Sequence, residues 1–384
     1  MRDYGRLLDE IGEAFEERFP RSSALHRDAC RHLVDGGSHT LRLTRPFPPR
    51  IVSAHGGRVR DEDGHDILDF WQGHMANILG HNPAIITSEL ERVFANGSGL
   101  QLGMTDLLQA EVAEILCRRT GADRVRLTTS GTLATMYGVM LARASTGRNL
   151  VMKVGGGWHG AQPWSLKGTV FKAGNGGGFG GVETEGLPAP VTEDVIVTAY
   201  NDPERLREDF ARHGDSVACF VVEPLIGAGG LIPATREYLA LARELTHQYG
   251  ALLIFDEVVN GFRFRAGNLG ALYGIAPDLA IYGKAIGGGM PVAALAGREE
   301  VMGLIGRAGG HRVAVLGGTE PVEDEGAVAT VLDEARLPED PQVTRDPGLR
   351  HPQDLHQLLD GELLDLVVDP QDLERQVSPP LPAA

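Results

Sequence analysis

The hydrophobic and polar positions of this chain alternate in a repeating rhythm between about Asp61 and Gly297. Short apolar or β-branched runs are followed by longer stretches with apolar residues at helical spacing. This pattern is typical of strands and helices that alternate around a mainly parallel sheet. The predicted strands are Val125–Thr129, Leu150–Val154, Val195–Thr198, Val217–Val222, Ala251–Phe255 and Leu279–Tyr282, and the clearest predicted helices are Thr132–Ser145, Pro203–Arg212 and Arg236–Tyr249.

The apolar runs ACFVV and ALLIF, near residues 218–222 and 251–255, are almost uninterrupted. Such runs are typical of parallel strands that are buried on both faces of a sheet. The sequence therefore predicts an α/β fold with helices on both faces. In open sheets of this class, ligands bind beyond the carboxyl ends of the strands, so we expect the functional residues to follow directly after them.

Two segments outside this rhythm have their own patterns. Near the N-terminus, Leu7, Leu8, Ile11 and Phe15 stand at helical spacing among charges, which predicts an amphipathic helix and not a signal peptide. The segment from Gly155 to Pro190 is too rich in glycine for a helix or a central strand. A flexible lid and a surface insertion are both compatible with that composition.

The C-terminal part differs sharply in composition from the rest. Beyond Thr319 it holds nine of the 22 prolines, and from Glu320 onward 16 acidic residues face only four arginines. That segment carries −12 of the total charge of −16, and we expect loose structure there. We therefore predict an N-terminal helix and segment over residues 1–60, a large α/β domain over 61–310 and an acidic, proline-rich tail over 311–384.

Composition narrows the class of protein. The 384 residues are 42% hydrophobic and 23% charged, as in ordinary soluble proteins, and the negative charge argues against a nucleic-acid partner. No apolar run approaches membrane-spanning length. Cys30, Cys117 and Cys219 form no CxxC pair, so we expect buried free thiols and a cytoplasmic location.

The phrase LTTSGTLAT places Ser130, Gly131 and Thr132 between a predicted strand and a predicted helix. The first turn of a helix offers unpaired N–H groups and a positive dipole end, and glycine lets the backbone approach a ligand closely. A phosphate group would fit such a cradle. The same residues would also serve as a plain helix cap.

The strand ALLIF ends in Asp256-Glu257. A partly desolvated carboxylate at this position would keep a nearby ring nitrogen protonated. A pyridine ring that serves as an electron sink requires such a partner. A solvent-facing acidic strand end or a metal ligand would give the same sequence.

The phrase IYGKAIGGGMP places Lys284 after a short apolar strand and before three glycines. Desolvation lowers the pKa of an amine and makes it nucleophilic toward aldehydes, so Lys284 is a candidate Schiff-base lysine. A solvated loop lysine is the alternative.

Two other chemistries lack support in the sequence. His74 and His81 are seven residues apart without a carboxylate partner at a zinc-binding spacing, so we predict no metal site. No serine lies in a GxSxG elbow, which argues against a hydrolase of that type.

The ordered set of motifs resembles a known family, the class III aminotransferases of pyridoxal-5′-phosphate (PLP) fold type I. Within it the chain is most similar to glutamate-1-semialdehyde 2,1-aminomutase and its relatives. The resemblance covers about residues 27–318. It rests on GGSHTLR at 36–42, DEDGHDILDFWQGHMANILGH at 61–81, TTSGTLATMYGVMLARASTGR at 128–148, GGGWHG at 155–160, AYNDPERL at 199–206, VVEPLIGAGG at 221–230, FDEVVNGFR at 255–263 and PDLAIYGKAIGGGMPVAA at 277–294.

The resemblance implies roles for residues at matching positions. It implies that Lys284 carries PLP as a Schiff base and that Asp256 faces the pyridine nitrogen. It also implies a gating role for the glycine-rich segment, which raises the lid interpretation above the insertion. The other implied cofactor contacts are Ser130, Gly131 and Thr132 at the phosphate, Val258 on one ring face, Trp158 in place of the usual stacking tyrosine, His159 and Glu223 around the ring, and Thr319 reaching a partner subunit's phosphate in a homodimer.

On the substrate side, the resemblance implies that Arg42 binds a carboxylate, although an ordinary surface salt bridge is the alternative. His39 and His74 occupy pocket-lining positions where the aminomutase usually has serine and tryptophan. The expected substrate is therefore a small amino acid or amino-aldehyde whose identity the motifs do not fix.

Two functions follow from these motifs. The first is PLP-dependent amino-group transfer, by an aminotransferase or an aminomutase. The second is a degenerate, non-catalytic PLP-fold protein. The phrase EPVEDEGAVATVLDE follows Gly317-Gly318-Thr319, where the family continues into a small α/β domain. Loss or replacement of that domain would weaken the dimer and PLP binding.

Overall fold

The structure is a computed structural model that describes residues 4–98, 105–171, 178–182 and 184–305. The chain divides into two units, residues 1–318 and residues 319–384, and all described residues belong to the first. The acidic tail and Thr319 lie outside the described residues. The prediction of boundaries at 60 and 310 stays a prediction.

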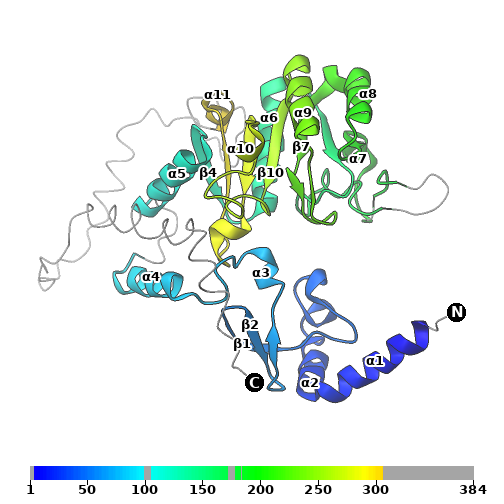
Figure 1. The fold of residues 1–384 in the computed structure, drawn as a ribbon, viewed down its shortest axis with the longest axis vertical. Helices are drawn as coiled ribbons and strands as arrows, with labels where there is room; N and C mark the ends of the chain where they lie inside the picture. The colour runs from blue at the N-terminus through cyan, green and yellow to red at the C-terminus, as the bar shows by residue number, and fades with distance from the viewer. Residues whose placement is uncertain (1–3, 99–104, 172–177, 183, 306–384) are drawn as a thin grey trace, which may run out of the picture. The chain divides into compact units, whose positions relative to one another are not determined.

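A seven-stranded sheet forms the centre of the first unit (Figure 1). Its strand order is β4-β12-β11-β10-β7-β5-β6, and β12 runs opposite to the other six strands. The predicted mainly parallel α/β fold is therefore confirmed. The strands are β4 (Arg124–Thr128), β5 (Leu150–Val154), β6 (Val195–Thr198), β7 (Val217–Val222), β10 (Leu252–Glu257), β11 (Leu279–Tyr282) and β12 (Ala293–Gly297).

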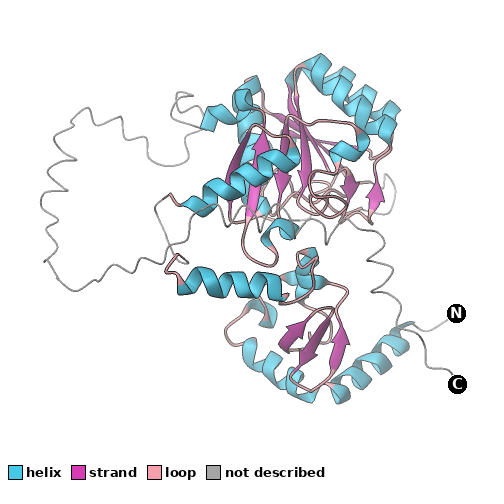
Figure 2. Ribbon diagram, turned by 60° about the vertical axis from the view of Figure 1, so that its left-hand side comes forward, coloured by secondary structure: helices cyan, strands magenta, loops and turns pink. Residues whose placement is uncertain are grey.

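Helices cover both faces of this sheet (Figure 2). Along β7, Cys219 and Val221 pack into the cluster with helix α6, whereas Phe220 and Val222 pack into the cluster with helices α8 and α9. All six residues of β7 are buried. Successive side chains of a strand point to opposite faces, which explains why the predicted strand is apolar without interruption.

Local capping signals fix the ends of the long helices. Ser130 begins helix α6, and Gly147 ends it in the left-handed conformation that glycine favours. Gly250 ends helix α9 in the same way. The main helices of the unit are α5 (Leu107–Thr120), α6 (Gly131–Thr146), α8 (Pro203–His213) and α9 (Arg236–Tyr249).

The N-terminal part consists of helices and a separate three-stranded antiparallel sheet. The predicted N-terminal helix is present, but Leu7, Leu8 and Ile11 are exposed while the Phe15 ring stacks on Phe19 at 4.3 Å. The elements of this part are α1 (Tyr4–Arg18), α2 (Pro20–Ala29), η1 (Val34–Gly36), η2 (Thr40–Arg42), β1 (Ile51–His55), β2 (Arg58–Asp61), β3 (Asp66–Leu68), α3 (Gln72–Met75) and α4 (Ala84–Ala95).

The remaining elements are short and connect the larger ones. The strands β8 and β9 pair with each other in a small hairpin. These connecting elements are α7 (Ala189–Glu193), η3 (Gly214–Ser216), β8 (Leu225–Ile226), β9 (Ile232–Pro233), α10 (Gly270–Tyr273), η4 (Lys284–Gly287), α11 (Glu299–Met302) and η5 (Gly303–Ile305).

Two further findings concern expectations from composition. No helix in the part of the chain that the structure describes is long and apolar enough to cross a membrane. The expectation of buried thiols is wrong for Cys30, which is exposed on the surface of the N-terminal part, whereas Cys117 is half-buried and Cys219 is buried. Cys219 alone lies on a central strand, which explains the difference.

Candidate active site

The candidate site lies at one edge of the seven-stranded sheet. Strands β4, β5, β7, β10 and β11 run in the same direction, so their carboxyl ends meet at that edge. The predicted motifs lie at the carboxyl ends of these five strands or directly after them. The fold thus brings together segments that are distant in the sequence, as the predicted sheet required.

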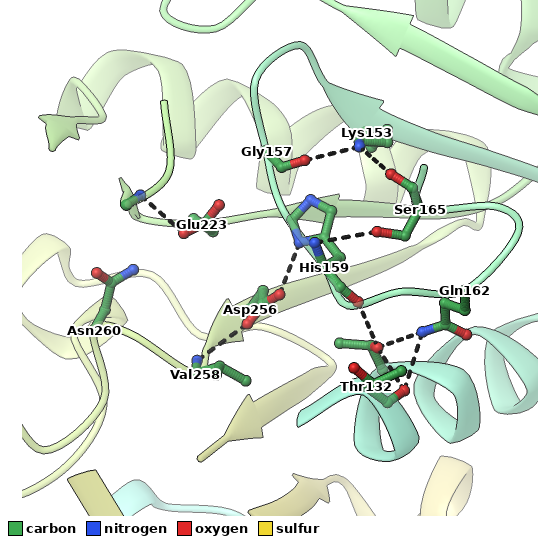
Figure 3. Close-up of polar contacts among 12 residues, drawn as sticks. Thr132, Lys153, Gly157, His159, Gln162, Ser165, Glu223, Asp256, Val258 and Asn260 are labelled. Atoms are coloured by element: carbon green, nitrogen blue, oxygen red, sulfur yellow. Dashed lines mark hydrogen bonds and ion pairs between the residues drawn. The ribbon is translucent and has the colours of Figure 1, made fainter. Parts of the chain in front are cut away.

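Asp256 is buried on β10, with 3% of its surface exposed. His159 Nδ1 donates a hydrogen bond to Asp256 Oδ2 at 2.7 Å, and the Val258 amide donates to Asp256 Oδ1 at 3.1 Å (Figure 3). Each oxygen therefore has one fixed donor and can accept another. The alternative of a solvent-facing acidic strand end is wrong, because β10 continues through Glu257 inside the packed sheet.

His159 is held from several sides. Its ring stacks on Trp164 at 5.7 Å, its amide donates to Ser165 Oγ at 3.2 Å, and its carbonyl accepts from Thr135 Oγ1 at 2.8 Å. Burial lowers the pKa of His159, although Asp256 opposes this shift. A neutral ring that donates from Nδ1 leaves Nε2 as an acceptor, and that atom is buried without a partner among the described residues.

The predicted phosphate cradle forms the start of α6. Ser130 Oγ accepts the Leu133 amide at 3.2 Å, so this hydroxyl serves as a helix cap, as the alternative interpretation of the motif expected. Gly131 packs against Val258: a methyl group on Gly131 would lie 2.8 Å from Val258 Cγ2. Thr132 lies beside Gly160, so the GGGWHG segment closes over the start of this helix.

Lys284 follows β11 at a sharp turn. Its φ of 44° lies in the left-handed region, which is unusual for a residue with a side chain. Burial lowers the pKa of Lys284, while the carboxylates of Asp256 and Glu223 oppose the shift. A methyl group on Gly283 would lie 3.2 Å from Val258 Cγ1, so the lysine turn packs beside the same valine as the helix start.

Glu223 follows β7 and is buried. Its Oε2 accepts the Gly227 amide at 2.9 Å, while Oε1 has no partner among the described residues. Burial, and then the nearby Asp256, raise the pKa of Glu223. Trp158 is 43% exposed at the edge of this group.

The predicted substrate residues also come together. The rings of His39 and His74 meet edge to face at 5.3 Å. Burial lowers the pKa of His74, and the positive charges of Lys284, His39 and Arg42 lower it further. Arg42 is exposed, and no ion pair joins it to another described residue, so the surface salt bridge of the alternative interpretation is not seen within the described ranges. The assigned roles of all these residues stay predictions.

Several residues of this site were not predicted. Lys153 lies inside strand β5, and a lysine within the apolar run LVMKV was a signal that could have revealed it. Gln162 Nε2 donates to the Thr132 carbonyl at 3.1 Å and also bonds Thr135, but nothing in the local sequence marks it. Arg263 donates to the carbonyl oxygens of Met75 and Val259, and its positive charge further lowers the pKa of Lys284.

Both ring nitrogens of His81 have hydrogen-bond partners among the described residues. Its Nε2 donates to Asp69 at 2.6 Å, and its Nδ1 pairs with Asn77 at 3.1 Å. No group of three potential metal-ligating His, Cys, Asp or Glu side chains gathers among the residues that the structure describes.

Comparison with known proteins gives consistent matches. The family model for class-III aminotransferases matches residues 42–319. Glutamate-1-semialdehyde 2,1-aminomutase of Aquifex aeolicus is 35% identical over 318 residues, which cover 79% of this chain and 74% of that protein. The enzyme of the same name from Pelotomaculum thermopropionicum is 37% identical over 337 residues, which cover 86% and 74%.

Solved structures agree with the sequence matches. An omega-transaminase from Sphaerobacter thermophilus superposes with a TM-score of 0.72 at 33% identity, covering 78% of this chain and 68% of that one. A glutamate-1-semialdehyde aminomutase from Pseudomonas aeruginosa gives 0.70 at 25% identity, covering 82% and 67%. A transaminase with PLP bound gives 0.67 at 33% identity, covering 74% and 66%. The chain thus spans about two thirds to three quarters of the length of these relatives.

Proposed function

The chain belongs to the class-III aminotransferase family of PLP-dependent enzymes, and on that premise we propose that it transfers amino groups with PLP bound to Lys284. The observation that carries this proposal is the contact of Val258 with both Gly131 and Gly283. This one side chain lies between the phosphate cradle, the Asp256 carboxylate and the lysine turn. The three motifs are therefore parts of one site.

The residues present fit the cofactor. The first turn of α6 offers amide donors for the phosphate, and the close packing of Gly131 against Val258 leaves no room there for a larger side chain. Asp256 has a free lone pair on each oxygen for the ring N–H. Trp158 and Val258 supply apolar surface for the two ring faces. When bound, PLP supplies an aldehyde that condenses with amines and a ring that accepts electrons.

The protein side chains have separate tasks in this scheme. The carboxylate of Asp256 keeps a proton on the ring nitrogen, and His159 keeps that carboxylate in position. The amine of Lys284, with its lowered pKa, attaches the cofactor and moves a proton at the substrate carbon when it is released. Arg42 binds the carboxylate of a small amino acid or amino-aldehyde.

His39, His74 and their surroundings select the substrate in this scheme. These two side chains replace the serine and tryptophan expected for the aminomutase, which supports an amino donor other than that of the aminomutase. We also infer a homodimer, because the family pattern has a threonine that reaches the partner's phosphate, and a cytoplasmic location. Thr319, the residue at that position, lies outside the described residues.

The decisive experiment traps the cofactor on the protein. The chain has only four lysines, Lys153, Lys167, Lys172 and Lys284, so borohydride reduction after PLP addition leaves few positions to distinguish. We expect the label on the peptide that contains Lys284. Lys284→Ala should lose the label and about 10²–10⁴-fold of the activity, whereas Lys167→Ala should keep both. A wild-type chain that takes up no PLP would instead favour the non-catalytic alternative.

A further inference from the structure

Lys153 is a buried cation that the proposed reaction does not use. It lies in the middle of strand β5, and none of its surface is exposed. Its ammonium donates hydrogen bonds to the carbonyl oxygens of Gly157 at 2.9 Å and Ser165 at 2.8 Å (Figure 3). It donates a third, to the carbonyl oxygen of Lys167, at 3.0 Å. No ion pair joins it to a carboxylate within the described ranges. A buried charge is costly, so this arrangement needs a reason.

The three carbonyl oxygens lie at the two ends of one loop. Gly157 begins the segment 157–167, while Ser165 and Lys167 end it. The ammonium therefore ties the start of this loop to its end. The loop between these bonds carries Trp158, His159, Gln162 and Trp164.

This loop supplies the group that holds Asp256. The His159 amide bonds Ser165 Oγ, so the residue tied by Lys153 also fixes the backbone of His159. The His159 ring then donates to Asp256 at 2.7 Å. Hydrogen bonds thus connect the ammonium to the carboxylate through Ser165 and His159.

We propose that Lys153 is a positioning residue, whose ammonium clamps the 157–167 loop so that His159 holds Asp256 in place for the cofactor ring. This inference rests on the proposed PLP function. Three donors arranged around a tetrahedral nitrogen suit three converging carbonyl oxygens, whereas the planar fork of arginine does not. A methionine of similar length would leave all three carbonyl oxygens unpaired.

Lys153 also lies near two buried carboxyl groups, those of Glu223 and Asp256. Burial lowers the pKa of Lys153 to about 8, and Glu223 and Asp256 oppose that shift. The side chain is therefore mostly protonated at neutral pH.

Tryptophan fluorescence tests the clamp without the cofactor. In a Trp71→Phe background, the remaining tryptophans are Trp158 and Trp164, both in the loop. Trp158 is 43% exposed and Trp164 only 5%. In the full-length apoprotein, Lys153→Met should raise the acrylamide-quenchable fraction about twofold, as Trp164 becomes accessible with Trp158.

Lys167→Met is the matched control. Lys167 also donates to two main-chain carbonyl oxygens, those of Thr192 and Val195, but these lie near the start of β6 and not in the loop. This variant should leave the quenchable fraction unchanged. If Lys153→Met does not fold, Lys153→Ala serves instead, and added methylammonium should restore the protection of Trp164. Equal quenching in wild type and the Lys153 variants, or equal effects at Lys153 and Lys167, would overturn the inference.

The loaded enzyme gives the second measurement. Lys153→Met should lower kcat about tenfold or more, while KM changes less than about twofold. The reason is that the substitution displaces Asp256, which acts on the cofactor ring and not on the substrate. The visible circular dichroism of the bound cofactor should change as well. An opened loop with wild-type kcat and spectrum would refute the positioning role. Absence of label on Lys284 in the wild type would refute the proposed function instead, and the apoprotein measurement would still decide the clamp.

Discussion

The cofactor end and the substrate end of the proposed site are built in different ways. Asp256 and His159 are buried, belong to or pack against central strands, and have several hydrogen bonds each. His39 and Arg42 are exposed and lie in or beside the three-residue helix η2. His74 lies in a short turn with a left-handed backbone. The proposed cofactor residues are thus buried in packed structure, whereas two of the proposed substrate residues are exposed on short segments.

This difference has a functional consequence. A rigid, buried site can hold charges in place before the reaction begins, which is the main source of electrostatic catalysis. Exposed short segments can change side chains at little cost in stability. We therefore expect mutations at the two ends to affect different kinetic constants.

Among the substitutions that separate the two ends of the site, Asp256→Asn should have the largest effect. The amide keeps the shape of the side chain, and its oxygen can still accept the hydrogen bond of the Val258 amide. It lacks the negative charge that keeps the ring nitrogen of the cofactor protonated. We expect kcat to fall about 10²–10³-fold with little change in KM, measured by steady-state kinetics with saturating PLP. A variant with wild-type kcat would show that the buried carboxylate has only a structural role.

A smaller effect, on stability instead of rate, is expected for Glu257→Gln. Glu257 is the buried neighbour of Asp256, and its carboxylate accepts the amides of Leu269 and Gly270 at 2.6 and 3.1 Å. Burial raises the pKa of Glu257 from 4.5 to about 7. Between these values the folded protein keeps a proton that the unfolded chain releases, so the free energy of unfolding should fall as pH rises from about 4.5 through 7.

Denaturant unfolding at pH 5 and pH 8 measures this effect. The contribution of Glu257 has an upper bound of about 3 kcal/mol, and Glu257→Gln should reduce the pH dependence while kcat stays within a few-fold of wild type. Part of the slope should remain, because the pKa of Glu223 is raised too. If the free energy of unfolding of the variant depends on pH as in the wild type, the pKa of Glu257 is not raised. A large loss of kcat would show that Glu257, like Asp256, is needed for catalysis.

The smallest effect should come from the substrate end. Arg42→Ala removes a charge-assisted hydrogen bond worth about 1.5–3 kcal/mol, so KM for a carboxylate-bearing donor should rise about ten- to hundred-fold. The value of kcat should change little. Arg31→Ala, at an exposed arginine paired with Asp28 in the same N-terminal part, is the control and should leave KM unaltered. If both variants behave alike, Arg42 is an ordinary surface arginine.

Much of the fold was predictable from local patterns. The bounds of β5, β6, β7, β11 and α9 agree with the predicted ranges to the residue. These elements have either uninterrupted apolar runs or clear capping residues. Strand β12 was missed, because its sequence AALAG has low β propensity and its strand character comes from pairing between β4 and β11.

The sequence by itself determined the α/β rhythm, the order of the motifs and the residue types at the strand ends, because these depend on local periodicity and on motif spacing. Only the tertiary structure decided that Asp256 is buried and not solvent-facing, and that Ser130 caps its helix. The tertiary structure alone also placed Val258 between two glycines and Lys153 beneath the loop of His159. The physical reason is that burial and hydrogen-bond partners arise from contacts between segments far apart in the sequence, such as Gly131 with Val258. Local sequence patterns carry no information about such contacts.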